Sequence, residues 1–198
     1  MNPSSVICEV MNEDGRMARL DDLLKFAKKH KLKIASIEDL ISYRLKNEKL
    51  ISKIKNKKIK IKKLGIFDLN IFKNKLDNSN HLAITKGKPS LMKSSRVRVI
   101  SIKKFNKVEN LKNNTFIKSM KYLSQFSNFA LIVIKNDFFN TIKDESIKST
   151  NILRYYGIGA QIIKDLKIKN MILVSRSNKK IIGLDGYGIK ITKQEIIK

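Results

Sequence analysis

The chain contains a single cysteine and no long apolar run. One cysteine, Cys8, excludes an internal disulfide framework. The longest apolar stretches, residues 129–134 and 171–174, have the length of strands and fall far short of the roughly 20 residues that span a bilayer. The chain does not begin with a charged and then apolar signal segment. We therefore expect a cytoplasmic protein that does not associate with membranes.

Acidic residues are scarce, because 17 Asp and Glu stand against 43 Lys and Arg, a formal net charge of +26 at pH 7. Such a balance is typical of nucleic-acid-binding proteins, whose clustered basic side chains neutralise phosphates. Only seven of the basic residues are Arg, the side chain that binds phosphates and base edges bidentately. The lysines are spread among Ile and Asn, without an RNA-binding aromatic signature or a zinc finger. We interpret the charge as a solvated surface with incidental affinity for polyanions, and we expect no specific nucleic-acid partner.

The chain is long enough for one sizeable core or two small ones, and 42% of its residues are hydrophobic. Composition and periodicity divide it into residues 1–50, a linker over residues 51–63 that is rich in Lys and Ile, and a second domain over residues 64–198. The alternating Ile and Lys of the linker predict an edge strand, whose lysines discourage pairing with other sheets. Strands that alternate with helices predict an α/β fold, with an α+β mixed sheet, for the second domain.

Hydrophobic spacing and capping residues predict the individual elements. In the first domain these are a buried strand over 4–10, a helix from Leu20, a short strand over 32–34, and a helix over 37–46 that starts at a capping box of Ser36 and Asp39. In the second domain the predicted strands cover 67–72, 81–87, 96–102, 129–135, 170–175 and 187–193. The predicted helices cover 110–125 and 151–166, with a helical turn near 178–182.

A specific motif near the start reads Val6-Ile-Cys-Glu-Val-Met-Asn-Glu-Asp-Gly15 and continues to Met17-Ala-Arg19. Over about the first 50 residues the chain resembles the closing segment of 3,4-dihydroxy-2-butanone 4-phosphate synthase. The resemblance implies that Glu9 is the active-site glutamate that contacts ribulose 5-phosphate, in a reaction that uses magnesium in the intact synthase. The family's other metal ligands and phosphate-binding residues would lie upstream of Met1, and one carboxylate cannot hold magnesium productively. We expect Cys8 to be a small buried hydrophobe.

A second motif near the end comprises Arg154-Tyr-Tyr-Gly-Ile-Gly-Ala-Gln-Ile162 and Gly183-Leu-Asp-Gly-Tyr-Gly188. From about residue 66 onward the chain resembles GTP cyclohydrolase II. The resemblance implies that Arg154 holds the position of the nucleophile toward the GTP phosphate, and that Ser175 and Lys180 hold positions that bind GTP. A glycine-containing turn at the head of a helix can also receive a phosphate through backbone N–H groups. The alternative for these glycines is close packing of the helix against the sheet.

The zinc chemistry of that family is not supported by the sequence. Catalytic zinc keeps three protein ligands, and the family supplies three cysteines where this chain has the cysteine-free run Val97–Phe105. Cys8, His30 and His81 lack the spacing of zinc ligands, and Ile152 stands where the family has its acid. We therefore expect no metal site and no cofactor in this chain, and no hydrolysis of GTP.

The two motifs occur in the order of the bifunctional fusion of these enzymes, which act in riboflavin biosynthesis. We expect the chain to be the C-terminal part of such a fusion, with a degenerate cyclohydrolase domain and neither activity by itself; the intact family member converts ribulose 5-phosphate into 3,4-dihydroxy-2-butanone 4-phosphate and formate. The expected partners are a second copy or an intact synthase, with weak binding of GTP or phosphate. Two alternatives stay open: a noncatalytic nucleotide-binding, assembly or regulatory module, and a polyanion-binding basic protein.

Overall fold

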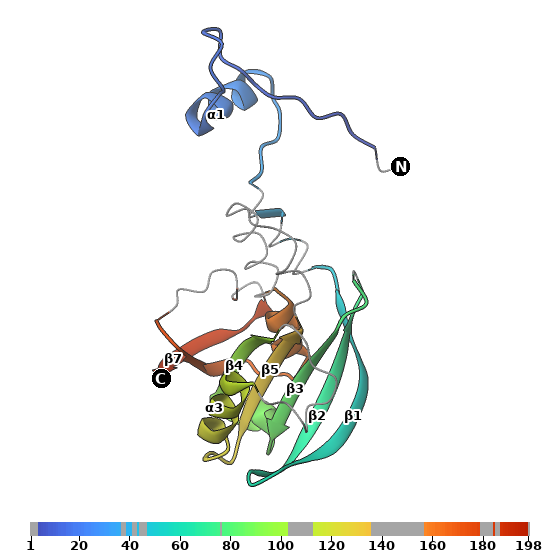
Figure 1. Cartoon of the computed structure of the whole chain (residues 1–198). Coiled ribbons are helices and arrows are strands. Elements are labelled where there is room, and N and C mark those ends of the chain that lie inside the picture. Colours follow the sequence, from blue (N-terminus) through green and yellow to red (C-terminus); the bar gives the residue numbers. More distant parts are fainter. Residues whose placement is uncertain are drawn as a thin grey trace. The chain divides into compact units, whose positions relative to one another are not determined.

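The computed structural model describes residues 4–36, 39–40, 43, 47–75, 77–102, 113–135, 157–178, 184 and 187–197. The chain divides into two compact units, Met1–Ile41 and Ser42–Lys198. The first contains the helix α1, Leu20–Lys29, and the second contains the sheet (Figure 1). No helix among these residues is long and apolar enough to cross a membrane.

Helix α1 begins at the predicted residue and has the charge distribution that a helix dipole favours. Asp21 and Asp22 lie in its first turn, and Lys28 and Lys29 in its last. The Asp22 carboxylate accepts hydrogen bonds from the Arg19 backbone N–H at 3.0 Å and, through the same oxygen, from the Asn12 side chain at 3.1 Å. These bonds join the preceding turn to the helix start.

The predicted capping box between Ser36 and Asp39 is confirmed. The Asp39 backbone N–H donates to Ser36 Oγ at 3.0 Å, and the Asp39 carboxylate accepts from the Ser36 backbone N–H at 3.3 Å. Residues 39, 40, 43 and 47 are helical, whereas residues 37–38, 41–42 and 44–46 of the predicted helix lie outside the described part of the chain.

The strands predicted over residues 4–10 and 32–34 are not formed, and nearly all of these residues are exposed. Cys8 is exposed as well, so its predicted burial is wrong. An isolated bridge between Met11 and Met17 closes the intervening turn. Among the described residues of this unit, Ala27 is the one buried hydrophobic residue. The described apolar residues of this unit therefore remain largely exposed, because they do not form a core of their own.

The second unit is a seven-stranded mixed sheet in the order β1-β2-β3-β5-β4-β6-β7, which confirms the predicted fold class. Its strands are β1 Ile51–Ile61, β2 Gly65–Asn74, β3 Asn80–Lys86, β4 Ser95–Ile102, β5 Phe129–Lys135, β6 Asn170–Ser175 and β7 Lys190–Ile196. The pairs β1/β2, β2/β3 and β3/β5 are antiparallel. The pairs β5/β4, β4/β6 and β6/β7 are parallel. The final strand begins three residues later than predicted.

Among the described residues, one helical segment packs against each face of the sheet. On one face α3, Asn114–Leu123, buries Phe116, Met120 and Leu123 against alternate residues of the central strands. On the other face the helical residues 157–165 bury Ile158 and Ile162. Residues 110–112 and 151–156 of the two predicted helices and most of the predicted turn near 178–182 lie outside the described residues, whereas residues 124–125 and 166, which were predicted to be helical, are turns. A short 3-10 helix, η1 Pro89–Leu91, precedes β4.

Strand β1 lies at the edge of the sheet, as the alternation of Ile and Lys predicted. Its pairing with β2 is interrupted by an irregularity between Lys53 and Lys55. Ile51, Ile59 and Ile61 are buried, and the lysines between and beside them are exposed. The segment thus contributes three side chains to the core although its composition is that of a linker.

Candidate functional site

The four residues singled out by sequence fall in different parts of the chain. Glu9 is exposed in the first unit. Ser175 ends β6 in the second unit and is 8% exposed. Arg154 and Lys180 lie outside the described residues, so their roles stay predictions.

Ser175 lies on the face of the sheet that carries residues 157–165. Side chains alternate along β6, and Met171 and Leu173 on that side join the same core cluster as Ile158. The Ser175 hydroxyl donates to the Ser177 carbonyl oxygen at 2.7 Å. This bond closes the strand end into a turn and leaves the hydroxyl oxygen with further accepting capacity.

Gln161 of the second motif and Asp165, one helical turn later, fasten the segment that enters the sheet. The Gln161 side chain accepts from the Leu50 backbone N–H at 2.9 Å and donates to the Glu48 carbonyl oxygen at 2.8 Å. One turn later, Asp165 forms an ion pair with Lys53 at 3.2 Å. Part of the motif is thus explained by the attachment of β1, without any ligand.

Glycine is not required for packing at position 159. A Cβ atom there would lie 3.4 Å from Val99 Cγ1, which is an ordinary van der Waals contact. The helix does rest on β4 at this position, but the contact leaves room for a Cβ atom, so packing alone does not require glycine here.

No role was predicted from the sequence for Arg98, a charged side chain that is buried in the sheet. It lies on β4, is 4% exposed, and its Nε and Nη1 atoms are buried without a hydrogen-bond partner among the described residues. Burial, and secondly the charge of Arg176, lowers the pKa of Arg98 from its ordinary value. The one signal available was an Arg between two Val residues in an apolar strand.

Arg98 lies on the α3 face, opposite the face that carries Ser175. Ile100 and Ile102, at alternate positions on β4, pack with α3 residues, whereas Val97 packs in the other cluster. Arg176 Nη2 donates to the Thr115 hydroxyl in the first turn of α3. Two guanidinium groups and the positive end of a helix dipole therefore meet on one side of the sheet.

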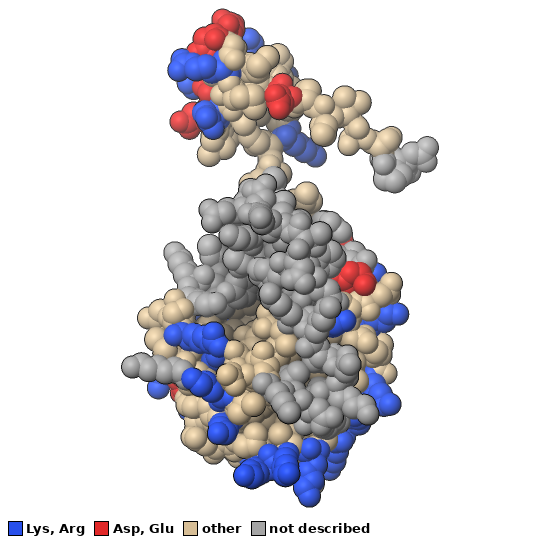
Figure 2. Space-filling view, viewed as in Figure 1, with Lys and Arg blue, Asp and Glu red and all other residues tan. Residues whose placement is uncertain are grey.

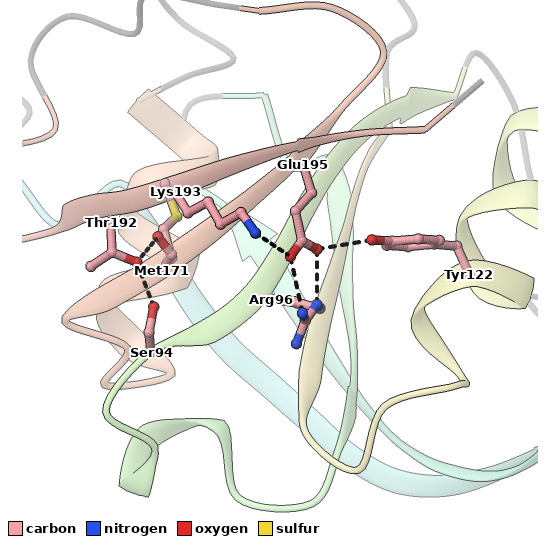
Figure 3. Close-up of polar contacts among 7 residues, drawn as sticks. All are labelled: Ser94, Arg96, Tyr122, Met171, Thr192, Lys193 and Glu195. Atoms are coloured by element: carbon pink, nitrogen blue, oxygen red, sulfur yellow. Dashed lines mark hydrogen bonds and ion pairs between the residues drawn. The ribbon is translucent and has the colours of Figure 1, made fainter.

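Arg96, two residues before Arg98, has its charge fully matched (Figure 3). Its Nε and Nη2 atoms donate to the Glu195 carboxylate at 2.9 Å each, and the Tyr122 hydroxyl donates to the same carboxylate at 2.9 Å. The guanidinium lies 3.7 Å from the centre of the Phe126 ring. Burial opposes ionisation of Glu195, yet the bonds from Arg96 and Tyr122 bring the pKa of this carboxyl below its ordinary value. This cluster joins β4, α3 and β7 and is explained by its role in the fold.

His81 has both ring nitrogens engaged within the fold. Its Nδ1 accepts from the Lys135 backbone N–H at 3.2 Å, and its Nε2 lies 3.3 Å from the Ser79 hydroxyl, which donates to Asp77 at 2.6 Å. Burial lowers the pKa of His81 to about 4, so the ring is neutral at pH 7. Such a ring is a structural hydrogen-bonding group rather than an open metal ligand.

No group of three or more His, Cys, Asp or Glu side chains in the described ranges could hold a metal ion. His30 and Cys8 belong to the first unit, where the His30 ring packs against Phe26 with ring centres 4.5 Å apart. The zinc implied by the resemblance to GTP cyclohydrolase II therefore does not fit the donors present, because three ligands are needed.

Comparison with known proteins agrees with both motifs. The family model of GTP cyclohydrolase II matches residues 52–195, nearly the whole sheet unit. The chain belongs to the GTP cyclohydrolase II family. The model of 3,4-dihydroxy-2-butanone 4-phosphate synthase matches residues 1–43. The order of the two matches is that of the bifunctional riboflavin biosynthesis proteins, which confirms the resemblance found in the sequence.

The relatives of this chain carry the names of the same pathway. It is 33% identical over 215 residues to the riboflavin biosynthesis protein RibBA of Endomicrobium trichonymphae, a match covering 97% of this chain and 53% of that protein. It is 37% identical over 195 residues to the 3,4-dihydroxy-2-butanone 4-phosphate synthase of Sulfurospirillum multivorans, covering 96% and 50%.

A solved structure shares the fold. The crystal structure of RibBX, a two-domain 3,4-dihydroxy-2-butanone 4-phosphate synthase from A. baumannii, matches with a TM-score of 0.67 and 31% identity. The match covers 96% of this chain and 53% of that one. The chain thus spans about half the length of the relatives it matches, and it belongs to the riboflavin biosynthesis family of synthase and cyclohydrolase proteins.

Proposed function

We propose that this member of the family does not open the guanine ring of GTP, and that its sheet unit serves as a noncatalytic module. The state of His81 carries the proposal. It is the sole histidine in the sequence after residue 41, no cysteine occurs in that part, and both of its ring nitrogens are engaged. Carboxylates alone do not replace the soft ligands that hold catalytic zinc in this family.

The test is formate release from GTP by the purified chain in buffer with added zinc. The expected rate equals the protein-free background. A complete GTP cyclohydrolase II, assayed in parallel, provides the positive control. Formate release by the chain above background, lost on addition of a chelator, would contradict the proposal.

For the synthase segment, we propose that Glu9 becomes catalytic only beside a synthase body. Two other carboxylates of this unit are already bonded within it, Asp14 to Arg16 at 2.8 Å and Asp22 to Asn12 at 3.1 Å. Magnesium requires several oxygen ligands, and the described residues of this unit do not assemble them. The partner is then an intact synthase, or a second copy of the chain in a homodimer, and the site of action is the cytoplasm.

An assay with ribulose 5-phosphate and magnesium tests this second part. The chain alone is expected to be inactive. Sedimentation of the chain alone and mixed with the two-domain synthase of A. baumannii distinguishes self-association from binding to a synthase. If the chain sediments as a monomer both alone and in the mixture, the proposal of a partner is wrong. The prediction that the chain does not hydrolyse GTP is not affected by this result.

A second candidate function, the binding of a phosphate-bearing ligand, is favoured by Arg98. Two nitrogen atoms of its guanidinium are buried without a hydrogen-bond partner among the described residues, which is destabilising, and Arg176 adds a second positive charge beside them. A phosphate group would relieve both, since phosphate accepts bidentate hydrogen bonds from Arg. Because the α3 face carries these groups, this support is independent of the predicted roles of Arg154, Ser175 and Lys180.

Isothermal titration with GTP, and separately with inorganic phosphate, tests this candidate. Arg98→Met is expected to abolish the heat of binding while raising the free energy of unfolding by about 1 kcal/mol or more, because an unpaired buried charge is removed. Arg16→Met, at an exposed position, is the matched control and should change neither quantity. Arg154→Ala tests the site that the resemblance predicts for GTP: a loss of binding heat in this variant, and not in Arg98→Met, would place the ligand there and not on the α3 face. No heat from the unmodified chain at millimolar ligand would reject the candidate.

A further inference from the structure

The densest charge on the molecule lies on the hairpin of β1 and β2. Between residues 51 and 75 the sequence contains nine lysines and one acidic residue, Asp68, a net charge of +8. All nine lysines are exposed: Lys53, Lys55, Lys57, Lys58, Lys60, Lys62, Lys63, Lys73 and Lys75. Seven of the nine lie within residues 53–63, the Lys-rich segment that was predicted as a linker, and the pairing of β1 with β2 brings Lys73 and Lys75 onto the same ribbon.

The free end of the hairpin extends beyond its neighbouring strand. Strand β2 pairs with β3 over residues 68–73, whereas its pairing with β1 continues to Gly65. Residues 59–67 therefore form a two-stranded ribbon at the sheet margin. Figure 2 shows Lys and Arg side chains gathered at this end of the hairpin.

The two faces of this ribbon differ. Ile59, Ile61 and Phe67 point into the core cluster on the α3 side. Lys58 and Lys60 alternate with these residues and lie on the opposite face, which is exposed. The turn adds Lys62 and Lys63 at its end. The result is a ribbon that is anchored by one face and presents ammonium groups on the other.

We propose that the β1–β2 hairpin binds the phosphodiester backbone of nucleic acid without reading its sequence. A two-stranded ribbon has the width that the major groove of a duplex admits. The free part of the ribbon, residues 59–61 paired with residues 65–67, is roughly 10 Å long, and the lysines along the rest of β1 extend the charged edge to roughly 36 Å, about one helical turn of B-form DNA. Lysine neutralises phosphates as a point charge, which supplies affinity but not base recognition.

The composition of the hairpin argues against base reading and against membranes. It contains no Arg, and its aromatic residues Phe67 and Phe72 are buried, so none can stack on a base. The exposed large apolar side chains within residues 51–75 are Ile54 and Ile66, too few for a face that inserts into lipid. The remaining exposed side chains, which are mainly lysines, support contact with the phosphodiester backbone of nucleic acid. The proposal goes beyond the riboflavin role and does not depend on it.

The test is binding of the full chain to a mixed-sequence DNA duplex by fluorescence anisotropy over a series of salt concentrations. The test variant replaces four lysines by glutamine, at Lys58, Lys60, Lys62 and Lys63. The control variant makes the same replacement in the first unit, at Lys28, Lys29, Lys31 and Lys33. Both variants lose four charges, and circular dichroism checks that both remain folded.

The unmodified chain is expected to bind with a steep salt dependence. If the four hairpin lysines each contact a phosphate, the test variant lowers the slope of log affinity against log salt by about 3 to 4. The control variant should leave the slope nearly unchanged, and a shuffled duplex should bind equally well. Equal losses in both variants would show that net charge alone attracts DNA and would overturn the proposal. So would binding to phosphatidylserine vesicles, through the same lysines, without binding to the duplex.

Discussion

Arg96 and Arg98 lie on the same face of β4, two residues apart, and within the described part of the chain they differ in their hydrogen bonding. Arg96 donates two hydrogen bonds to Glu195, whereas two nitrogen atoms of Arg98 are buried without partners among the described residues. The charge of Arg96 is thus neutralised by a carboxylate, whereas no described residue neutralises the charge of Arg98 in this way. The first holds the fold together, and the second stores a positive charge that an anion would stabilise.

Glu195→Ala is expected to destabilise the sheet unit by about 1 to 3 kcal/mol, because it leaves the Arg96 guanidinium and the Tyr122 hydroxyl without their acceptor. Urea denaturation measures the loss. Lys193→Gln is the matched control, since Lys193 approaches the same carboxylate at 3.9 Å and is well exposed; it should change stability by less than about 0.5 kcal/mol. Equal effects of the two substitutions would contradict the conclusion that the bonds from Arg96 and Tyr122 to Glu195 stabilise the sheet unit.

Stability is expected to fall on acidification through His81. Burial holds its pKa at about 4 in the folded chain, against about 6.5 in the unfolded chain. Between these values the unfolded state binds a proton that the folded state does not, so unfolding becomes easier as pH falls. The loss approaches about 1.4 kcal/mol per pH unit within the window and reaches about 3 kcal/mol in total below pH 4.

Urea denaturation at a series of pH values between about 7.5 and 5 checks this. His81→Gln keeps an acceptor and a donor on the side chain and should flatten the profile. His30→Gln, in the first unit, should not. An unchanged profile in His81→Gln would show that another group causes the acid sensitivity.

The strands of the core were predictable because their residues form continuous apolar runs with clear ends. Residues 129–135 and 170–175 have the predicted bounds. The prediction failed at residues 4–10, since a strand needs a partner strand and the described residues offer only the bridge between Met11 and Met17. Arg98 was missed because its burial depends on α3, and its neighbour Arg176 lies 78 positions further along the chain.

Gln161→Leu is expected to destabilise the chain by about 2 to 4 kcal/mol, because the Leu50 N–H and the Glu48 carbonyl lose the side chain that bonds both. Gln161→Glu is the graded control. It keeps an acceptor for Leu50 but removes the donor to Glu48, so its effect should be intermediate. Amide hydrogen exchange at Leu50 gives the local measurement, and protection there should fall in Gln161→Leu. Undiminished protection would mean that the Gln161 side chain does not hold the segment before β1 in place.

Gly87→Ala is expected to be more damaging than Gly188→Ala, although both glycines have similar positive φ angles, 67° and 68°. Backbone strain of about 1 kcal/mol is common to both. A Cβ atom at Gly87 would also lie 2.5 Å from the Ser127 carbonyl oxygen and closer still to Asn128, whereas nothing lies within 4 Å at Gly188. Asn128 cannot move aside freely, because its side chain accepts from the Lys88 backbone N–H at 2.8 Å. Thermal unfolding should therefore place Gly87→Ala well below Gly188→Ala, and equal melting temperatures would show that the loop after β3 yields without cost.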